Sequence, residues 1–162
     1  MIPVDVVGLR LDAATNQPIL VLQEAEGARL LPIWIGAAEA SAIELTRRGI
    51  QPDRPLTHDL LRDLLTTLGR TLDAVHVTSL ADGVFYAELH LDGGVTLSCR
   101  PSDAVALALR TASPILVAES VLEVAGIVVG PEEDGDEQVV EQFREFLDDI
   151  NPEDFADPTP GN

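Results

Sequence analysis

Short apolar runs separated by turn residues dominate the start of the chain. Three of these runs are rich in Val, Leu and Ile: Pro3–Leu11, Pro18–Gln23 and Arg29–Ile35. Such runs predict β-strands, and the turn cluster between the first two predicts that they form a hairpin. Pro32 has no N–H to donate to a neighbouring strand, which favours an edge position or a bulge in the third strand.

Helical spacing of apolar residues then replaces the strand pattern. It predicts three helices, over residues 36–48, 58–68 and 103–111. Thr57 and Ser102 precede the second and third helices and are of the residue types that cap helix N-termini. The predicted buried stripe of the second helix consists of Leu60, Leu61, Leu64, Leu65 and Leu68.

A second group of strands follows the second helix. Leu72–Leu80 and Val84–Leu91 are expected to form a second hairpin, and further strands are expected at Val95–Cys99 and Pro114–Ala118. A short helix is expected at Ser120–Ala125, followed by an apolar patch at Ile127–Val129. This order lacks the regular alternation of strand and helix that produces a parallel α/β sheet. The pattern therefore predicts an α+β fold with a mainly antiparallel sheet and packed helices.

The distribution of charge divides the chain near Gly130. The 162 residues include 28 acids and ten bases, all of them arginine, for a net charge of −18. Residues 131–162 hold 12 of the acids and one arginine. We interpret residues 1–130 as the folded domain and 131–162 as an acidic linker, an amphipathic helix and a frayed tail. The apolar stripe of that helix consists of Val139, Phe143, Phe146, Leu147 and Ile150.

Composition excludes several classes of protein. The single cysteine, Cys99, excludes an intramolecular disulfide and a zinc site built from cysteines. No apolar run approaches the roughly 18 residues of a membrane span, and the N-terminal stretch lacks the basic region of a secretory signal. We expect a soluble, cytoplasmic protein. The common phosphate-loop, zinc-protease and serine-hydrolase motifs are absent.

His58 and Asp59 form the first candidate site. They lie in the segment RPLTHDL, just after a loop and at the expected start of a helix. A histidine there can act as a general base or metal ligand, with Asp59 as a ligand or as the group that orients the imidazole. The alternative is structural, because an acid in the first turn complements the helix dipole and adjacent helical residues point about 100° apart. Spacing alone leaves both interpretations open.

Arg100, Ser102 and Asp103 form the second candidate site, where a strand meets a helix. Such a junction gathers free backbone N–H groups and suits an anion such as phosphate, with Arg100 as a further donor. Capping by Ser102 and a dipole interaction of Asp103 would explain the same residues. Glu39 and Glu44 can supply a carboxylate to a Mg²⁺ site or be solvated helix charges.

Four segments together resemble the bifunctional nuclease (BFN) domain family. They are LLPIWIGAAEASAIEL, RPLTHDLLRDLL, VFYAELHL and SCRPSDAVALALR, in this order. The resemblance covers about residues 3–130 and is strongest to short actinobacterial members with a similar acidic tail. It implies a mixed, barrel-like sheet, a homodimer, and nuclease activity on DNA and RNA in some relatives. Pro32 and the apolar segment IWI also suggest a rim that a second copy would cover.

The motifs of the resemblance also pick out individual candidates: Glu39, Arg54, His58, Asp59, Arg100, Ser102 and Asp103. In our hypothesis for a nuclease, His58, Asp59 and Asp103 are catalytic, Arg54, Arg100 and Ser102 bind the substrate, and Asp59, Asp103 and Glu39 are ligands of a divalent metal such as Mg²⁺. In that scheme His58 is the base in phosphodiester hydrolysis, and Arg54 or Arg100 binds the phosphate.

The net charge weighs against tight binding of nucleic acid. Phosphate contacts normally come from Lys and Arg, and residues 1–130 contain nine arginines and no lysine. We therefore expect weak binding without sequence specificity that falls as salt rises. The alternative function is a non-catalytic regulatory or interaction module whose acidic tail is the docking element.

Overall fold

The computed structural model of the chain describes residues 1–130. The helix and tail predicted for residues 131–162 lie outside the described residues, and the division of the chain at Gly130 stays a prediction. In the described part, no helix is long and apolar enough to cross a membrane.

Eight strands and four α-helices make up residues 1–130, so the predicted α+β class is confirmed. The strands are β1 (Ile2–Leu11), β2 (Pro18–Glu24), β3 (Arg29–Trp34), β4 (Leu72–Ala81), β5 (Val84–Leu91), β6 (Val95–Cys99), β7 (Ile115–Val117) and β8 (Ile127–Val128). The helices are α1 (Ala37–Arg47), α2 (Thr57–Thr67), α3 (Pro101–Thr111) and α4 (Glu119–Ala125), and a 3₁₀ turn, η1 (Asp92–Gly94), joins β5 to β6.

All eight strands form one sheet in the order β6-β5-β4-β7-β1-β2-β3-β8. Every neighbouring pair is antiparallel except β4 and β7, which are parallel, so the sheet is mixed and mostly antiparallel. The predicted barrel-like closure is wrong, because the sheet is open, with β6 at one end and β8 at the other. Closure would require those two strands to pair, and β8 offers only two residues.

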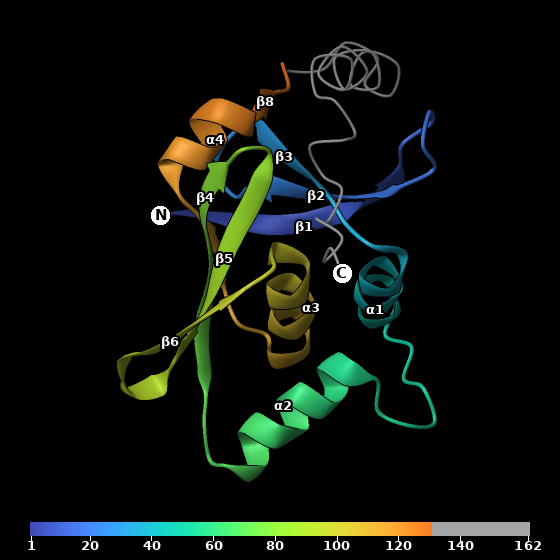
Figure 1. Cartoon of the computed structure of the whole chain (residues 1–162), viewed down its shortest axis with the longest axis vertical. Helices are drawn as coiled ribbons and strands as arrows, with labels where there is room; N and C mark the ends of the chain where they lie inside the picture. The colour runs from blue at the N-terminus through green and yellow to red at the C-terminus, as the bar shows by residue number, and fades with distance from the viewer. Residues whose placement is uncertain (131–162) are drawn as a thin grey trace, which may run out of the picture.

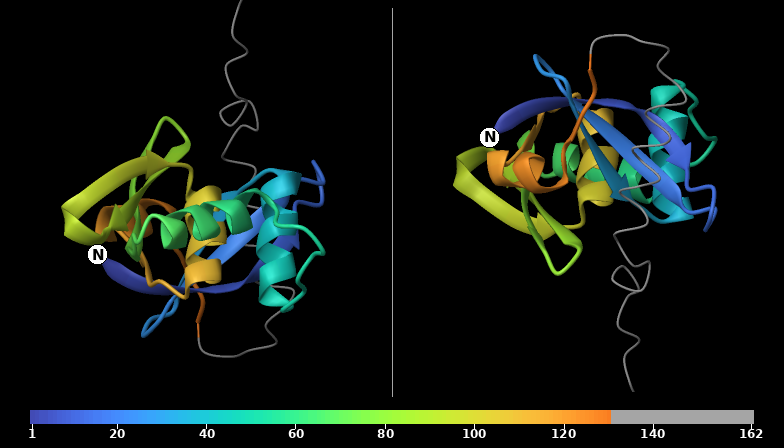
Figure 2. Two further views of the ribbon diagram at one scale, coloured as in Figure 1. Left: turned by 90° about the horizontal axis from the view of Figure 1, so that it is seen from below. Right: turned by 90° about the horizontal axis from the view of Figure 1, so that it is seen from above.

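Helix α3 occupies the centre of the molecule, against the sheet, with α1 beside it and α2 across one end (Figures 1 and 2). Its apolar residues are small or branched, and five consecutive ones are buried: Ala104, Val105, Ala106, Leu107 and Ala108. A helix that is apolar on nearly all sides belongs inside a protein. The core therefore surrounds α3, whose N-terminus holds the second candidate site.

Helix α2 differs from its prediction. Of the expected buried stripe, only Leu65 packs against the core, whereas Leu60, Leu61, Leu64 and Leu68 are exposed. The one residue of α2 that is buried is His58, in its first turn. The helix is thus fastened at its start, and most of its apolar stripe faces outward.

The apolar segment IWI is not an exposed rim. Ile33 and Ile35 are buried in the core, and β8 pairs with β3 only at Arg29 and Leu30. No strand of residues 1–130 therefore pairs with Pro32 on that side, which agrees with the edge-like position predicted from its missing N–H. Four exposed leucines lie instead on α2 and just after it: Leu60, Leu61, Leu64 and Leu68.

Candidate functional site

The starts of α2 and α3 bring the two candidate segments together. His58 is the second residue of α2, Asp103 is the third residue of α3, and His58 Nε2 lies 3.0 Å from Asp103 Oδ1. The His58 side chain is only 9% exposed. The fold therefore brings together two residues that are 45 positions apart in the sequence.

The charge on Asp103 fixes the tautomer of His58. Burial opposes ionisation of Asp103, but hydrogen bonds and positive charge from Arg100 and His58 outweigh it, so its pKa is lowered from 3.8. An ionised carboxylate only accepts hydrogen bonds, so in the neutral imidazole of His58 the proton is on Nε2, which donates to Asp103, and Nδ1 carries the lone pair. Every fully buried side-chain N or O atom of the described residues has a hydrogen-bond partner. Nδ1 hydrogen-bonds to no described residue, so it is not fully buried.

Arg100 completes the cluster and connects α3 to α1. Its Nε donates to Asp103 Oδ2 at 2.7 Å, and its Nη2 donates to Glu39 Oε1 at 2.8 Å. It is the N-cap residue of α3, and Pro101 follows at the first helical position, where its missing N–H costs nothing. The hydrogen bonds to Asp103 and Glu39 raise the pKa of Arg100 further, against the effect of burial. Its side chain is nevertheless 64% exposed.

The carboxylate of Asp59 lies elsewhere. Asp59 Oδ1 accepts a hydrogen bond from Arg110 Nε at 2.7 Å, and Oδ2 accepts one from the backbone N–H of Leu56, the N-cap of α2. Burial opposes ionisation, but these bonds and the Arg110 charge lower the pKa of Asp59. Thr57 is therefore the first residue of α2 rather than its cap, and Asp59 caps the helix and fastens it to α3.

Arg110 is a residue that the sequence analysis missed. Its side chain is 3% exposed, and besides Asp59 it donates to the carbonyl oxygens of Ala106 and Ala42. Its hydrogen bonds thereby connect α3 to both α1 and α2. The signal was present in the sequence, because an arginine that ends an Ala/Val/Leu helix must find a partner if the helix is buried.

Ser102 and Arg54 have contrasting environments. Ser102 is buried inside the first turn of α3, and the predicted cap position belongs to Arg100. It is 5% exposed, and its role in binding a substrate stays a prediction. Arg54 is exposed in the loop before α2 and forms no ion pair with a described residue. It stays a candidate for binding phosphate.

The predicted metal ligands do not converge. Within residues 1–130, no group of three His, Cys, Asp or Glu side chains is arranged to hold a metal ion. The three carboxylates are instead paired with cations: Asp59 with Arg110, Asp103 with Arg100 and His58, and Glu39 with Arg100. These donors do not fit a Mg²⁺ site in this arrangement, so no step is derived through one, and the metal stays a prediction.

Two further groups lie outside the cluster. His76 and His90 stack on one face of the β4–β5 hairpin with ring centroids 3.8 Å apart, and burial followed by the nearby His90 charge lowers the pKa of His76. Cys99 precedes Arg100, and burial, then Asp103 and Glu88, raise its pKa to about 11. Its thiol is therefore protonated at neutral pH and is a poor nucleophile.

Comparison with known proteins identifies a family for this arrangement. The family described as "Bifunctional nuclease domain" matches residues 20–130, which contain every residue of the cluster. The chain is 50% identical over 158 residues to "Uncharacterized protein Rv1829" of Mycobacterium tuberculosis (strain ATCC 25618 / H37Rv), and the match covers 94% of this chain and 96% of that one.

Plant proteins are more distant relatives. "Bifunctional nuclease 1" of Oryza sativa subsp. indica is 27% identical over 116 residues, which cover 67% of this chain and 35% of the rice protein. "Bifunctional nuclease 2" of Arabidopsis thaliana is 27% identical over 110 residues, covering 64% of this chain and 33% of the plant protein. The chain thus spans about a third of the length of these nucleases.

Proposed function

Because the chain belongs to the bifunctional nuclease domain family, we propose that it is a nuclease that hydrolyses phosphodiester bonds of DNA and RNA with little sequence specificity. The observation that carries the proposal is the meeting of His58, Asp103 and Arg100 in one cluster within the matched segment. The cluster supplies a proton acceptor and an exposed cation, and both are useful in phosphodiester hydrolysis.

In the proposed reaction, His58 moves the protons. A water oxygen forms a bond to phosphorus while His58 Nδ1 takes one of the water protons. The bond between phosphorus and the departing sugar oxygen breaks, and the imidazolium returns the proton to that oxygen. Asp103 keeps its hydrogen bond to Nε2, so it orients the ring and stabilises its charged form. One water is consumed and His58 ends in its starting state.

Arg100 binds the phosphate in this proposal. Its guanidinium is a planar donor set that matches phosphate oxygens, and more than half of its side chain is exposed. Negative charge on the phosphate increases as water attacks, and a fixed cation stabilises that charge. Arg54 is exposed in the loop just before α2 and lies only four positions before His58 in the sequence. In the proposal it adds a second positive charge for the phosphate.

The test is digestion of labelled single-stranded DNA and RNA by the purified full-length chain, with and without EDTA. His58→Ala should lower the cleavage rate by about 10²- to 10⁴-fold, the usual contribution of a general base. His90→Ala is the matched control, because His90 also pairs with a carboxylate but lies outside the cluster, and it should cleave at the wild-type rate. Equal cleavage by both variants would contradict the proposal.

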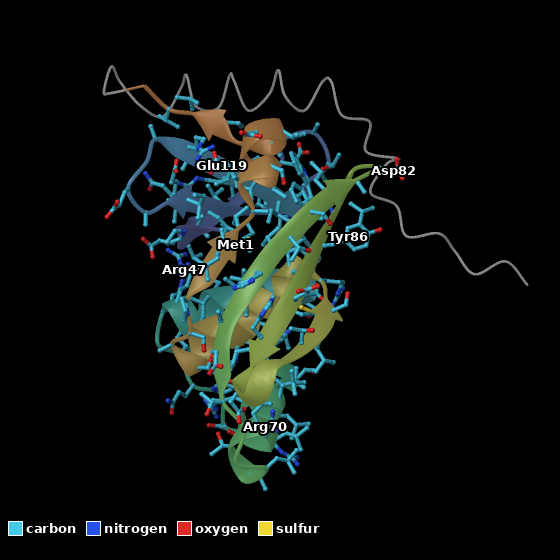
Figure 3. All side chains as sticks on the ribbon, turned by 90° about the vertical axis from the view of Figure 1, so that its left-hand side faces the viewer. Met1, Arg47, Arg70, Asp82, Tyr86 and Glu119 are labelled. Atoms are coloured by element: carbon cyan, nitrogen blue, oxygen red, sulfur yellow. The ribbon has the colours of Figure 1, made fainter. Side chains whose placement is uncertain are left out.

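We also propose that the chain forms a homodimer through α2. The exposed apolar residues of α2 face away from the core, and Figure 2 (left) looks directly onto this helix. Strand β6 is an edge of the sheet with Val95 and Leu97 exposed. Arg70, labelled at the lower end in Figure 3, binds Asp92 of η1 and so places the end of α2 beside the start of β6.

Charge favours a second copy as the occupant of this surface. Residues 54–70 carry three arginines and two aspartates, and β6 carries no charged residue, in a chain with a net charge of −18. Two copies can therefore meet here without the repulsion that their acidic surfaces would produce elsewhere. An unpaired antiparallel edge strand is also able to pair with its own copy across a two-fold axis.

A further inference from the structure

Arg100 is already bound by two carboxylates in the structure. Asp103 and Glu39 hold it from α3 and α1, with Nε–Oδ2, Nη2–Oδ1 and Nη2–Oε1 distances of 2.7, 3.1 and 2.8 Å. The Arg100 side chain is 64% exposed, whereas that of Glu39 is 16% exposed. Both carboxylates thus lie deeper than the cation, and a phosphate from solvent meets a guanidinium whose charge is already neutralised.

The two carboxylates have different tasks. Asp103 also holds His58, so its loss would disturb the proposed base together with Arg100. Glu39 hydrogen-bonds to Arg100 alone among the described residues. It therefore affects the cluster only through the charge and the donors of Arg100.

We propose that Glu39 is a built-in competitor for the phosphate-binding Arg100 and thereby sets the affinity of the site for nucleic acid. The inference rests on the proposed function and adds a determinant of substrate binding to it. A phosphate that binds Arg100 displaces the Nη2 bond to Glu39, while the two bonds to Asp103 keep the guanidinium beside His58. Two features therefore weaken substrate binding in this proposal. One is the competition of Glu39 for Arg100, and the other is the net negative charge of the chain.

Gly36 provides the space that Glu39 occupies. It is the N-cap residue of α1, and a Cβ added there would overlap Glu39 Oε2. The backbone of Gly36 has φ −73° and ψ 157°, which alanine adopts without strain. Gly36→Ala should therefore displace the carboxylate of Glu39 while leaving the net charge of the chain unchanged.

The experiment measures binding of a short fluorescein-labelled single-stranded DNA to the full-length chain by anisotropy, at low salt and in EDTA. Glu39→Gln should bind about two- to fivefold more tightly than wild type, the size of one exposed ion pair. Gly36→Ala should change the affinity in the same direction. Glu44→Gln is the matched control, because Glu44 is also on α1 and pairs with Arg47 and Arg48 instead. The change in DNA affinity of Glu44→Gln should be small, and it measures the effect of removing one negative charge alone.

Kinetics distinguish competition from a positioning role. A competitor predicts that Glu39→Gln lowers KM and leaves kcat unchanged, whereas loss of a residue that positions Arg100 would lower kcat. Equal or weaker binding by Glu39→Gln relative to Glu44→Gln, in variants that melt at the wild-type temperature, would overturn the inference. If wild type binds and cleaves in that case, the nuclease proposal survives. If neither wild type nor any variant binds or cleaves, both proposals fail.

Discussion

Asp59 and Asp103 occupy the same helical position, the third residue of α2 and of α3, yet their partners differ. Asp103 meets a histidine and an exposed arginine, and Asp59 meets the buried Arg110. The first pairing includes Arg100, whose side chain is exposed and can meet a ligand. The second pairing neutralises Arg110 inside the protein. At the residue scale, the environment of each carboxylate rather than its position in a motif therefore decides its role.

Replacement of Asp59 should destabilise the fold. Asp59→Ala leaves Arg110 buried without a counter-ion, and breaking such a pair costs about 3–5 kcal/mol. Asp63→Ala is the matched control on the same helix, because Asp63 pairs with Arg62 at the exposed surface and should cost less than about 1 kcal/mol. Urea unfolding of both variants measures the difference. Equal losses would show that the Asp59–Arg110 pair does not fasten α2.

The pH dependence of stability should report on Asp103. Its pKa in the folded chain is below 3.8, because the bonds from Arg100 and His58 outweigh the burial that opposes ionisation. A group with a lowered folded pKa stabilises the fold above its unfolded pKa and loses that contribution as pH falls through the folded value. The excess stability of wild type over Asp103→Asn should therefore be constant near neutral pH and shrink below pH 3.8. A difference that stays constant into that acid range would contradict the lowered pKa.

The positions of His58 and Asp103 were predictable because each residue lies at a strand- or loop-to-helix junction that the sequence marks clearly, but the meeting of the two side chains depends on the packing of α2 on α3. The direction of Asp59 was not predictable, since adjacent residues of a helix point about 100° apart and the sequence does not say which one faces α3. Its partner Arg110 is 51 residues away, and only the packing of α2 on α3 brings the two together.

At the scale of elements, local patterns predicted where strands and helices lie but not what covers them. The hairpins β1–β2 and β4–β5 follow from apolar runs separated by turn residues, and both are confirmed. The leucine stripe of α2 was expected to be buried, yet it is mostly exposed. Periodicity shows that one face of a helix is apolar, but it does not identify what packs against that face. In our proposal the partner of α2 is a second copy of the chain. Closure of the sheet likewise depends on the end strands, and not on any single strand pattern.

The exposed face of α2 should control dimerisation. Leu64→Glu places a carboxylate in the proposed interface, where its burial without a partner is costly, and should convert a dimer of twice 17.3 kDa into a monomer. Val124→Glu is the control, because Val124 is an exposed apolar residue of α4, at the opposite end of the molecule in Figure 1. Light scattering at micromolar protein measures both. A wild-type monomer, or a dimer of Leu64→Glu, would contradict the proposal.

At the scale of the whole molecule, net charge opposes the function that the local cluster supports. In the proposed function Arg100 and Arg54 bind a polyanion, while the chain carries a net charge of −18. Charges further apart than the Debye length, about 10 Å at 0.1 M salt, are largely screened. Long-range repulsion therefore acts mainly at low salt, whereas the competition by Glu39 within the cluster persists at moderate salt. The two effects can be separated by varying the ionic strength.

A chain that ends at Gly130 should bind single-stranded DNA more tightly than the full chain. The truncation removes 12 acids and one arginine and leaves every residue of the cluster in place. The repulsion of the DNA falls accordingly, so the affinity should rise most at low salt, and the two chains should become similar as salt screens the charge. Anisotropy over a salt series measures this, and equal melting temperatures show that residues 1–130 fold alone. Equal affinity of both chains at low salt would show that residues 131–162 do not restrain binding, and the weak affinity would then belong to the cluster itself.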